Sequence, residues 1–291
     1  MTVAILEVAA PSTRYADVVD RLVRQRDRLT NAQARAMLRL LADVRRRLLD
    51  DLTRAAGGGS TYQAWQRGQL RQAVEDAAAG LVRRAGAELQ DDLRQAWEAG
   101  SAFQPTALAA AGVMLTPRAI SVDQLLVAQE LAGSLVTRLG SDALTQLNRL
   151  VTLGVVGSVP VGRLMSQVAA VLRTQPTRAA PRLGSIAYQA ERVVRNEMLS
   201  VFAMADEVRV ADVADQVPGL LKVWDAVGDE RTRPDHGSAG RRYDEAGAIP
   251  IQQDFVVGGH RAARPHDPRL PASQTVMCRC VRRLWSPEWA D

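Results

Sequence analysis

The side chains best suited to chemistry are concentrated near the C-terminal end of this 291-residue chain. Residues 229–236 read Asp-Glu-Arg-Thr-Arg-Pro-Asp-His, and residues 278–280 read Cys-Arg-Cys. All three histidines, His236, His260 and His266, lie in this region, as do both cysteines. Histidine and cysteine are preferred zinc ligands, and clustered carboxyl and imidazole groups can transfer protons. The region therefore has the residue types for a metal site or for acid–base catalysis.

The two cysteines lie in a segment, residues 276–285, whose apolar and β-branched residues predict a strand. Strand alternation would put the sulfurs of Cys278 and Cys280 on one face and Arg279 on the other. A shared zinc ion would then need one of the three histidines, and His236 is our candidate third ligand. Two cysteines in a strand also pack well as small apolar residues, so the default expectation is that no cofactor is bound.

The charged string has a structural interpretation as well as a catalytic one. Arg231 and Arg233 can pair with Asp225, Asp229 or Asp235 and hold a loop-rich module together. Charge clusters are more often structural than catalytic. Because no nucleophile triad, phosphate-binding loop or His-Glu-x-x-His motif accompanies the string, we expect no catalytic residues here.

The residues before 218 have apolar positions at helical spacing almost throughout. Glycine and proline mark the expected ends: the Gly57–Gly59 run, Gly100 as a cap, a loop with Pro105 and Pro117, and a boundary at residues 140–142. The predicted helices cover residues 14–56 (with a capping box at Thr30 and Gln33), 61–99, 121–139, 142–156, 161–173 and 186–213.

The helical pattern stops at Pro218 and Gly219. Residues 220–227 predict a buried strand, residues 276–285 a second, and residues 255–257 a short third. The fold class is therefore mainly α, with a long-helix N-terminal body followed by a small α+β C-terminal module. We predict three regions along the chain: 1–150 as the helical body, 151–217 as a helical core, and 218–291 as the α+β module.

Composition limits the classes of protein that this chain can belong to. Hydrophobic residues make up 47% and charged residues 24%, which is too apolar for a disordered chain. The sequence contains no 18-residue uncharged apolar run, so no transmembrane helix is expected. The N-terminus is a poor match to a signal peptide. Two cysteines two residues apart cannot form a disulfide that crosslinks distant parts of the fold. We therefore expect reduced thiols in a cytosolic compartment.

The net charge of +5 is too small for a nucleic-acid footprint over the whole chain, and Lys222 is the single lysine. Residues 258–283, however, hold six arginines against one acid, Asp267. This local excess predicts phosphate contacts or an acidic partner. The candidate DNA-binding residues are Arg264, Arg269, Arg279, Arg282 and Arg283.

Several segments occur in an order that resembles the Mu F-like head morphogenesis family, the minor capsid proteins of tailed bacteriophages. The resemblance covers about residues 150–283, from Leu-Val-Thr-Leu-Gly-Val-Val-Gly-Ser onward. It is carried by Arg195 and Glu197 in a long helix, by Trp224 before the 229–236 string, and by the 278–280 triplet. Asn196 stands where the family usually has threonine, and Met277 where it has asparagine.

The resemblance implies a minor head protein that associates with the portal during head assembly and assists DNA packaging or delivery. It implies a place in the virion, inside the head near the portal, after assembly in the host cytoplasm. The implied partners are the portal protein, a scaffold or major capsid protein, and packaged double-stranded DNA, with no membrane. The motif residues that the resemblance marks as structural are Arg195, Glu197, Trp224, Asp229, Arg231, Arg233 and His236.

Two alternative functions stay open at the level of sequence. One is an enzyme: a zinc-dependent hydrolase with Asp229, His236 and the cysteines, or an ADP-ribosyltransferase-like site with Arg195 and Glu197. The other is a DNA-binding accessory protein that acts through the arginines of residues 258–283.

Overall fold

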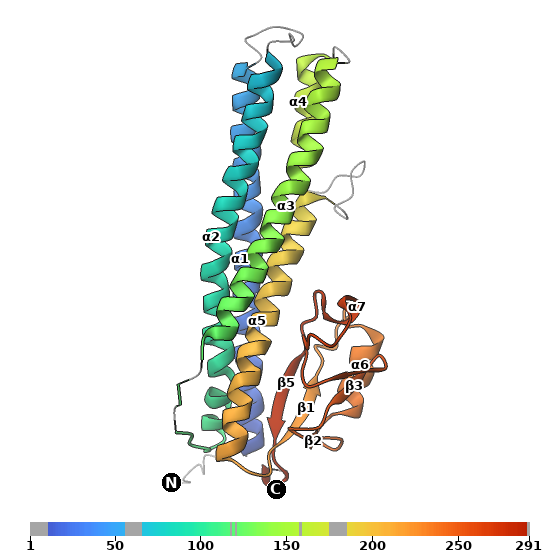
Figure 1. Ribbon diagram of the computed structural model, residues 1–291. Helices are drawn as coiled ribbons and strands as arrows, with labels where there is room; N and C mark the ends of the chain where they lie inside the picture. The colour runs from blue at the N-terminus through green and yellow to red at the C-terminus, as the bar shows by residue number, and fades with distance from the viewer. Residues whose placement is uncertain are drawn as a thin grey trace, which may run out of the picture. The chain divides into compact units, whose positions relative to one another are not determined.

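The computed structural model describes residues 11–55, 66–116, 118–119, 121–156, 159–174 and 185–289 of the chain. It confirms a mainly α fold with a small α+β module at the C-terminal end (Figure 1). The predicted ends at Gly57–Gly59 and Pro117 lie outside the described residues. The helices are α1 (Pro11–Ala55), α2 (Gln66–Ala110), α3 (Asp123–Val156), α4 (Val161–Val171), α5 (Ile186–Gln216), α6 (Pro234–Arg242) and α7 (Ala272–Thr275).

The chain divides by compactness into two units, each made of segments far apart in sequence. The first unit comprises Met1–Thr30, Leu93–Leu126 and Asn196–Asp291, and the second comprises Asn31–Asp92 and Val127–Arg195. The first unit contains the whole α+β module together with parts of α1, α2 and α5 and the start of α3. The predicted linear division into three regions is a division by sequence character and stays a prediction.

Two glycines expected at helix ends instead lie inside long helices. Gly100 lies in α2, and a Cβ there would come within 2.2 Å of the carbonyl oxygen of Phe202. Gly140 lies in α3, and a Cβ there would come within 2.2 Å of a methyl carbon of Val82. Both expected boundaries were wrong because these glycines permit a neighbouring segment to approach closely, which offsets their cost to the helix.

Pro105 also lies inside α2, and not in the expected loop. Proline has no N–H, so the carbonyl of Ser101, four residues earlier, loses its intrahelical hydrogen bond. The Arg209 side chain of α5 replaces that bond, with Nε donating to the Ser101 oxygen at 3.3 Å. The helix therefore continues because a long-range donor satisfies the group that proline leaves unpaired.

The module is built on a three-stranded antiparallel sheet in the order β2-β1-β5 (Figure 1). Pro250 ends the edge strand β2. Proline is tolerated on an edge strand because the side that faces away from the sheet makes no hydrogen bonds to a neighbouring strand. The predicted strands at 220–227 and 255–257 are confirmed as β1 and β3, whereas the strand predicted at 276–285 is confined to β5. The strands are β1 (Leu221–Asp225), β2 (Ile249–Pro250), β3 (Phe255–Val257), β4 (His260–Ala262) and β5 (Val281–Trp285), followed by a 3-10 turn, η1 (Pro287–Trp289).

A two-residue turn joins β3 to β4, with Gly258 at φ 55° and Gly259 at φ 80°. Positive φ at both positions is the requirement of a tight hairpin turn, which glycine meets without strain. Gly258 is constrained further, because a Cβ there would lie 2.4 Å from the amide nitrogen of Gln274 and 2.7 Å from an Asp235 oxygen.

Two apolar cores contain residues from the strands of the sheet in the first unit. One core joins helical segments to β5 and η1 and includes Tyr15, Val19, Phe103, Leu108, Phe202, Val210, Leu284 and Trp289. The other lies within the module and includes Trp224, Tyr243, Ile249, Phe255, Val257, Leu270, Cys278 and Cys280. The module therefore has an apolar core of its own and is also packed against the helices of the first unit.

A buried chain of hydrogen bonds ties β5 to three helices. The Leu284 N–H donates to the Tyr15 hydroxyl (2.9 Å), which donates to Oε1 of Gln104 (2.8 Å). The Gln104 amide donates to Oδ1 of Asp206 and to the main-chain carbonyl of Arg282, both at 3.0 Å. The Arg282 guanidinium closes the network on Oδ2 of Asp206 at 2.8 Å.

The charges in this network are matched inside the protein. Burial raises the pKa of Asp206, and the adjacent Arg282 opposes that rise. Desolvation lowers the pKa of Arg282, but the carboxylates of Asp206 and Glu207 outweigh it and leave this pKa above its ordinary value. The Arg282 side chain is 1% exposed and also donates to Glu207, so the guanidinium is fixed between α5 and β5.

None of the described helices combines the length and the apolar character needed to cross a membrane.

Replacement of Arg282 by alanine should lower the free energy of unfolding by about 3–5 kcal/mol, because it leaves Asp206 buried without its charge partner. Urea unfolding measures this. Arg283→Ala is the matched control: its partner Asp225 lies 3.4 Å away in a more exposed pair, worth at most about 1 kcal/mol. Equal losses in the two variants would contradict the role assigned to the network.

Asp92 should make stability fall as the pH rises. Burial, with the adjacent charges of Glu88 and Asp91, raises its pKa to about 7. The pKa of an aspartate in the unfolded chain is about 3.9. Between these two pKa values the folded state binds one more proton than the unfolded state, so the free energy of unfolding falls as the pH rises and that proton is lost. Asp92→Asn should therefore gain stability over the wild type between pH 5 and pH 8, as measured by thermal unfolding. A constant difference across that range would contradict the assignment.

Candidate metal centre

The charged string is shaped by a proline that starts α6. Residues before proline avoid helical angles, and Arg233 is extended (φ −60°, ψ 143°) while Pro234 is the first helical residue. This places His236 in the first turn of α6, where its side chain is 2% exposed. The Arg233 side chain donates to the main-chain carbonyl of Val276, so the start of α6 is fixed to the loop that carries the cysteines.

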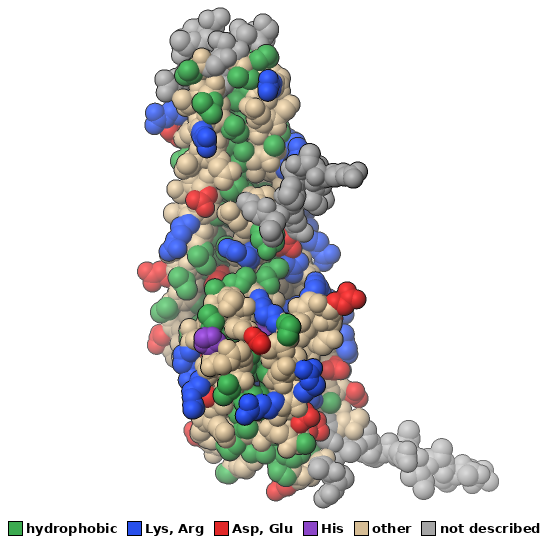
Figure 2. All heavy atoms as spheres, turned by 90° about the vertical axis from the view of Figure 1, so that its right-hand side faces the viewer, with side chains coloured by type: hydrophobic (Ala, Val, Ile, Leu, Met, Phe, Trp, Pro, Cys, Tyr) green, Lys and Arg blue, Asp and Glu red, His purple; other side chains and the backbone are tan. Residues whose placement is uncertain are grey.

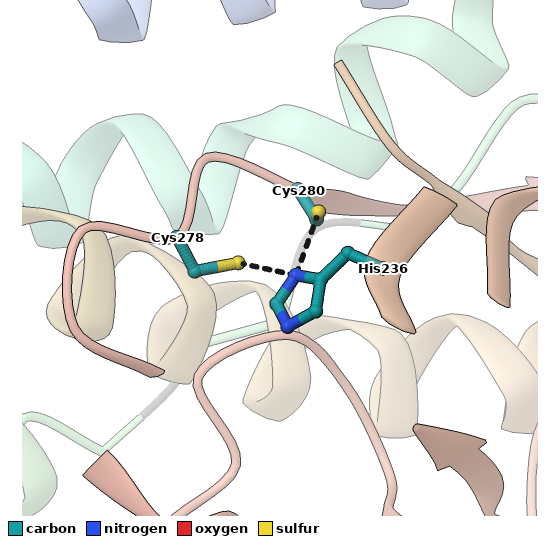
Figure 3. Close-up of side chains that lie close together, drawn as sticks. All are labelled: His236, Cys278 and Cys280. Carbon is teal, nitrogen blue, oxygen red and sulfur yellow. Dashed lines mark hydrogen bonds between the residues drawn. The ribbon is translucent and has the colours of Figure 1, made fainter. Parts of the chain in front are cut away.

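Three potential metal ligands converge in the core of the module. Nδ1 of His236 lies 3.3 Å from the Cys280 sulfur and 3.5 Å from the Cys278 sulfur (Figure 3). The three ligand atoms lie within 4.8 Å of one another, and all three residues are buried. Among the described residues, this is the group of histidine, cysteine or acidic side chains whose geometry suits a metal ion.

The other imidazole nitrogen of His236 is held by a two-residue relay. Nε2 lies 2.9 Å from Oε1 of Gln274, and the Gln274 amide nitrogen donates to Oδ2 of Asp235 at 2.7 Å. Metal-bound histidines commonly have such a partner on the second nitrogen, which fixes the ring orientation. The ring of His236 is also packed edge-on to Trp224, with centroids 5.6 Å apart.

The Cys-Arg-Cys triplet lies in a loop before β5, and not on the expected strand. Met277 adopts a left-handed conformation (φ 60°), so strand alternation is not what brings the sulfurs together. Two outside side chains fix the loop by its carbonyls: His266 Nε2 lies 2.8 Å from the Cys278 oxygen, and Arg26 donates to the Arg279 oxygen at 2.8 Å.

Asp229 organises the loop between β1 and α6. Its Oδ1 accepts from the Arg231 N–H (3.1 Å), the Thr232 hydroxyl (3.2 Å) and the Arg279 guanidinium (2.6 Å). The hydrogen bond from Arg279 holds the pKa of Asp229 well below its usual range. Asp229 therefore connects the charged string to the triplet, and it is not among the three converging ligands.

The two thiols influence each other's ionisation, and the arrangement favours the thiolate of Cys278. The hydrogen bond from Cys280 lowers the pKa of Cys278, with a further contribution from His236 against the effect of burial. The same hydrogen bond, together with burial, raises the pKa of Cys280. The indole Nε1 of Trp224 is buried without a hydrogen-bond partner, and its N–H favours the thiolate of Cys280.

The remaining histidines lie outside this cluster. His260 is exposed on β4. His266 is buried, but its Nδ1 lies 3.1 Å from the Ser200 hydroxyl and its Nε2 faces the Cys278 carbonyl. Of the three histidines left open by the sequence, His236 is therefore the one directed at both sulfurs.

Arg195 and Glu197 have different surroundings. Arg195 donates to Glu191 at 2.9 Å and to Asn31 at 2.6 Å, both of which are helical residues. Glu197 is buried and accepts from the Asn196 amide at 2.9 Å. Burial raises the pKa of Glu197, and the nearby His266 opposes that rise. Glu197 thus lies near His266, the residue whose Nε2 contacts the Cys278 carbonyl.

The five candidate DNA-binding arginines are engaged with groups of this chain. Arg264 and Arg282 are buried, and Arg264 donates to the carbonyls of Pro265 and His266. The others pair with carboxylates: Arg269 with Asp254 and Asp267, Arg279 with Asp229, and Arg283 with Asp225 and Glu245. Figure 2 shows basic and acidic side chains interspersed on the face that it presents. DNA contact stays a prediction.

Sequence reasoning missed the residues that support the cluster. Gln274 and Asp235 form the relay to His236, and Ser200 orients His266. The adjacent glycines Gly258 and Gly259 could have predicted the hairpin turn that packs on Gln274. No local feature of the sequence predicts that a glutamine on α7 reaches His236.

Comparison with family models, with curated proteins and with solved structures gives no match for this chain.

Replacement of Met277 by asparagine should raise the free energy of unfolding by about 0.5–1 kcal/mol. A left-handed conformation costs most side chains roughly 1–2 kcal/mol, and asparagine tolerates it better than methionine does. Met277→Ala is the control, because alanine keeps the Cβ and therefore the strain. Chemical denaturation compares the three proteins; an asparagine variant no more stable than the alanine variant would contradict this explanation.

Proposed function

We propose that this protein is a minor head protein of a tailed bacteriophage that binds the portal during head assembly, and that its role is structural. The observation that carries the proposal is the convergence of the motif residues in one place. Residues of the 229–236 string and of the 278–280 triplet are in direct contact, although about forty residues separate them. The resemblance of these motifs to the Mu F-like family then concerns one folded unit.

The way the motif side chains are used favours a structural role over catalysis. Arg233 donates to the Val276 carbonyl, Asp229 accepts from Arg279, and His236 is 2% exposed. A catalytic group must reach a substrate, whereas these groups are directed at other parts of the module. This supports a module whose polar residues maintain its shape.

The helical body supplies surfaces for assembly. Val127 and Leu131 lie four residues apart on α3, so their side chains share a face, and they are 66% and 55% exposed. Such residues are in the 1–150 region that we propose docks on the portal. In this proposal the protein remains in the virion near the portal, with packaged DNA as a neighbour.

Co-expression with the portal protein of the same genome tests the proposal. The two proteins should co-purify and co-elute in size-exclusion chromatography. The double variant Val127→Glu, Leu131→Glu should lose at least about tenfold in affinity for the portal, because it places two charges in an apolar contact. The helical circular dichroism of this variant should not change.

A glutamate at Val256 is the matched control. Val256 is a 37% exposed apolar residue of β3, outside the region proposed to dock, so portal binding should be unaffected. If the portal protein assembles in this co-expression but purifies free of this chain, the result would contradict the proposal. Equal losses in the two glutamate variants would exclude residues 127 and 131 as the docking surface.

A further inference from the structure

The tautomer of His236 follows from the residues that support it. The Asp235 carboxylate can only accept a hydrogen bond, so the Gln274 atom that faces it at 2.7 Å is the amide nitrogen. The Gln274 oxygen therefore faces Nε2 of His236 at 2.9 Å, and this nitrogen must carry the proton. Nδ1 is left with its lone pair directed toward the two cysteine sulfurs (Figure 3).

Two sulfur atoms share that one lone pair. Nδ1 can accept one hydrogen, so at most one of the two thiols can donate to it. A metal ion satisfies all three atoms together. For zinc bonds of about 2.3 Å to sulfur and about 2.05 Å to nitrogen at the tetrahedral angle, the nitrogen and sulfur are about 3.5 Å apart. The observed separations are 3.3 and 3.5 Å.

We propose that His236 Nδ1, Cys278 Sγ and Cys280 Sγ bind one zinc ion in a structural site. No fourth histidine, cysteine or carboxylate group joins the cluster among the described residues, so this part of the chain supplies three of the four ligands of a tetrahedral ion. Thiolate and imidazole ligands select zinc over magnesium and calcium, which prefer oxygen. The ligands are buried (2%, 3% and 6% exposed), so the ion holds the fold together without access for a substrate.

The ion would join two segments that the sheet alone does not connect. His236 belongs to the first turn of α6, and the cysteines belong to the loop that enters β5. The core of the module contains few large residues besides Trp224, Tyr243 and Phe255. Small cores commonly depend on a metal or another crosslink for stability, and metal binding then adds directly to folding. This site does not rest on the head-assembly role.

The purified full-length protein tests the site by elemental analysis and cobalt substitution, with a phosphine reductant present throughout. We expect about one zinc per chain. Cobalt added to the chelator-treated protein should give thiolate-to-cobalt charge-transfer bands and the visible bands of a tetrahedral ion. Cys278→Ser and Cys280→Ser should each remove about half of the charge-transfer intensity or abolish binding.

Gln274→Ala separates the site from a general effect on folding. It leaves the three ligands in place but removes the partner of Nε2, and such changes typically weaken metal affinity about 10–100-fold. Thr275→Ala, at the next position of α7, is the matched control, because the Thr275 hydroxyl bonds only locally, to Pro271. It should bind zinc with wild-type affinity.

Thermal unfolding gives the readout for structure. Chelation should lower the unfolding temperature of the wild type on the order of 5 °C or more and should not change that of His236→Ala. The proposal is overturned if the folded wild-type protein contains no zinc and gives no cobalt bands. It is also overturned if His236→Ala, Cys278→Ser and Cys280→Ser retain wild-type zinc content.

Discussion

The burial of Arg282 between β5 and α5 is the constraint on which the first unit depends. An arginine that is 1% exposed costs several kcal/mol to desolvate, and only matched carboxylates and carbonyls offset that cost. Asp206 supplies the charge, and Gln104 bonds both to Asp206 and to the Arg282 carbonyl. These groups meet in one arrangement of α2, α5 and β5, so the network specifies how the module attaches to the helices more than it adds net stability.

The same network determines where the cysteines lie. Cys280 precedes Arg282 by two residues, and Arg282 is paired with Trp224 across the β1–β5 ladder. With β5 fixed to the helices, Cys280 packs in one core with Trp224, whose ring contacts His236. Arg26 of α1 holds the Arg279 carbonyl in the same loop. The positions of the two sulfurs are therefore set by α1 and by the core of the module.

The helices and the central strands could be predicted from the sequence because they depend on local periodicity. The apolar stripe through Met37, Leu41 and Leu48 is buried as expected. The errors at Gly100 and Pro105 have a different origin, since each residue is a helix breaker by propensity and is tolerated by a contact from α5. Such contacts join positions about one hundred residues apart and leave no local signal.

The candidate site was predictable in residue type but not in geometry. The sequence offered three histidines, and the choice of His236 depended on the start of α6 at Pro234. The sulfurs were expected to share a face through strand alternation, yet the left-handed Met277 and the carbonyl contacts of the loop achieve it instead. Asparagine tolerates such a backbone conformation better than methionine does.

The near absence of lysine has a structural counterpart in how the arginines are used. A guanidinium has five donors in a plane and can serve a carbonyl and a carboxylate together, which an ammonium does less well. Arginines donate to main-chain carbonyls at many points: Arg26 to Arg279, Arg45 to Ala169, Arg209 to Ser101, Arg233 to Val276, and Arg264 to Pro265 and His266. A charge count cannot distinguish such inward arginines from outward ones. The basic excess of residues 258–283 is therefore used at least in part to hold the module together, whatever its surface binds.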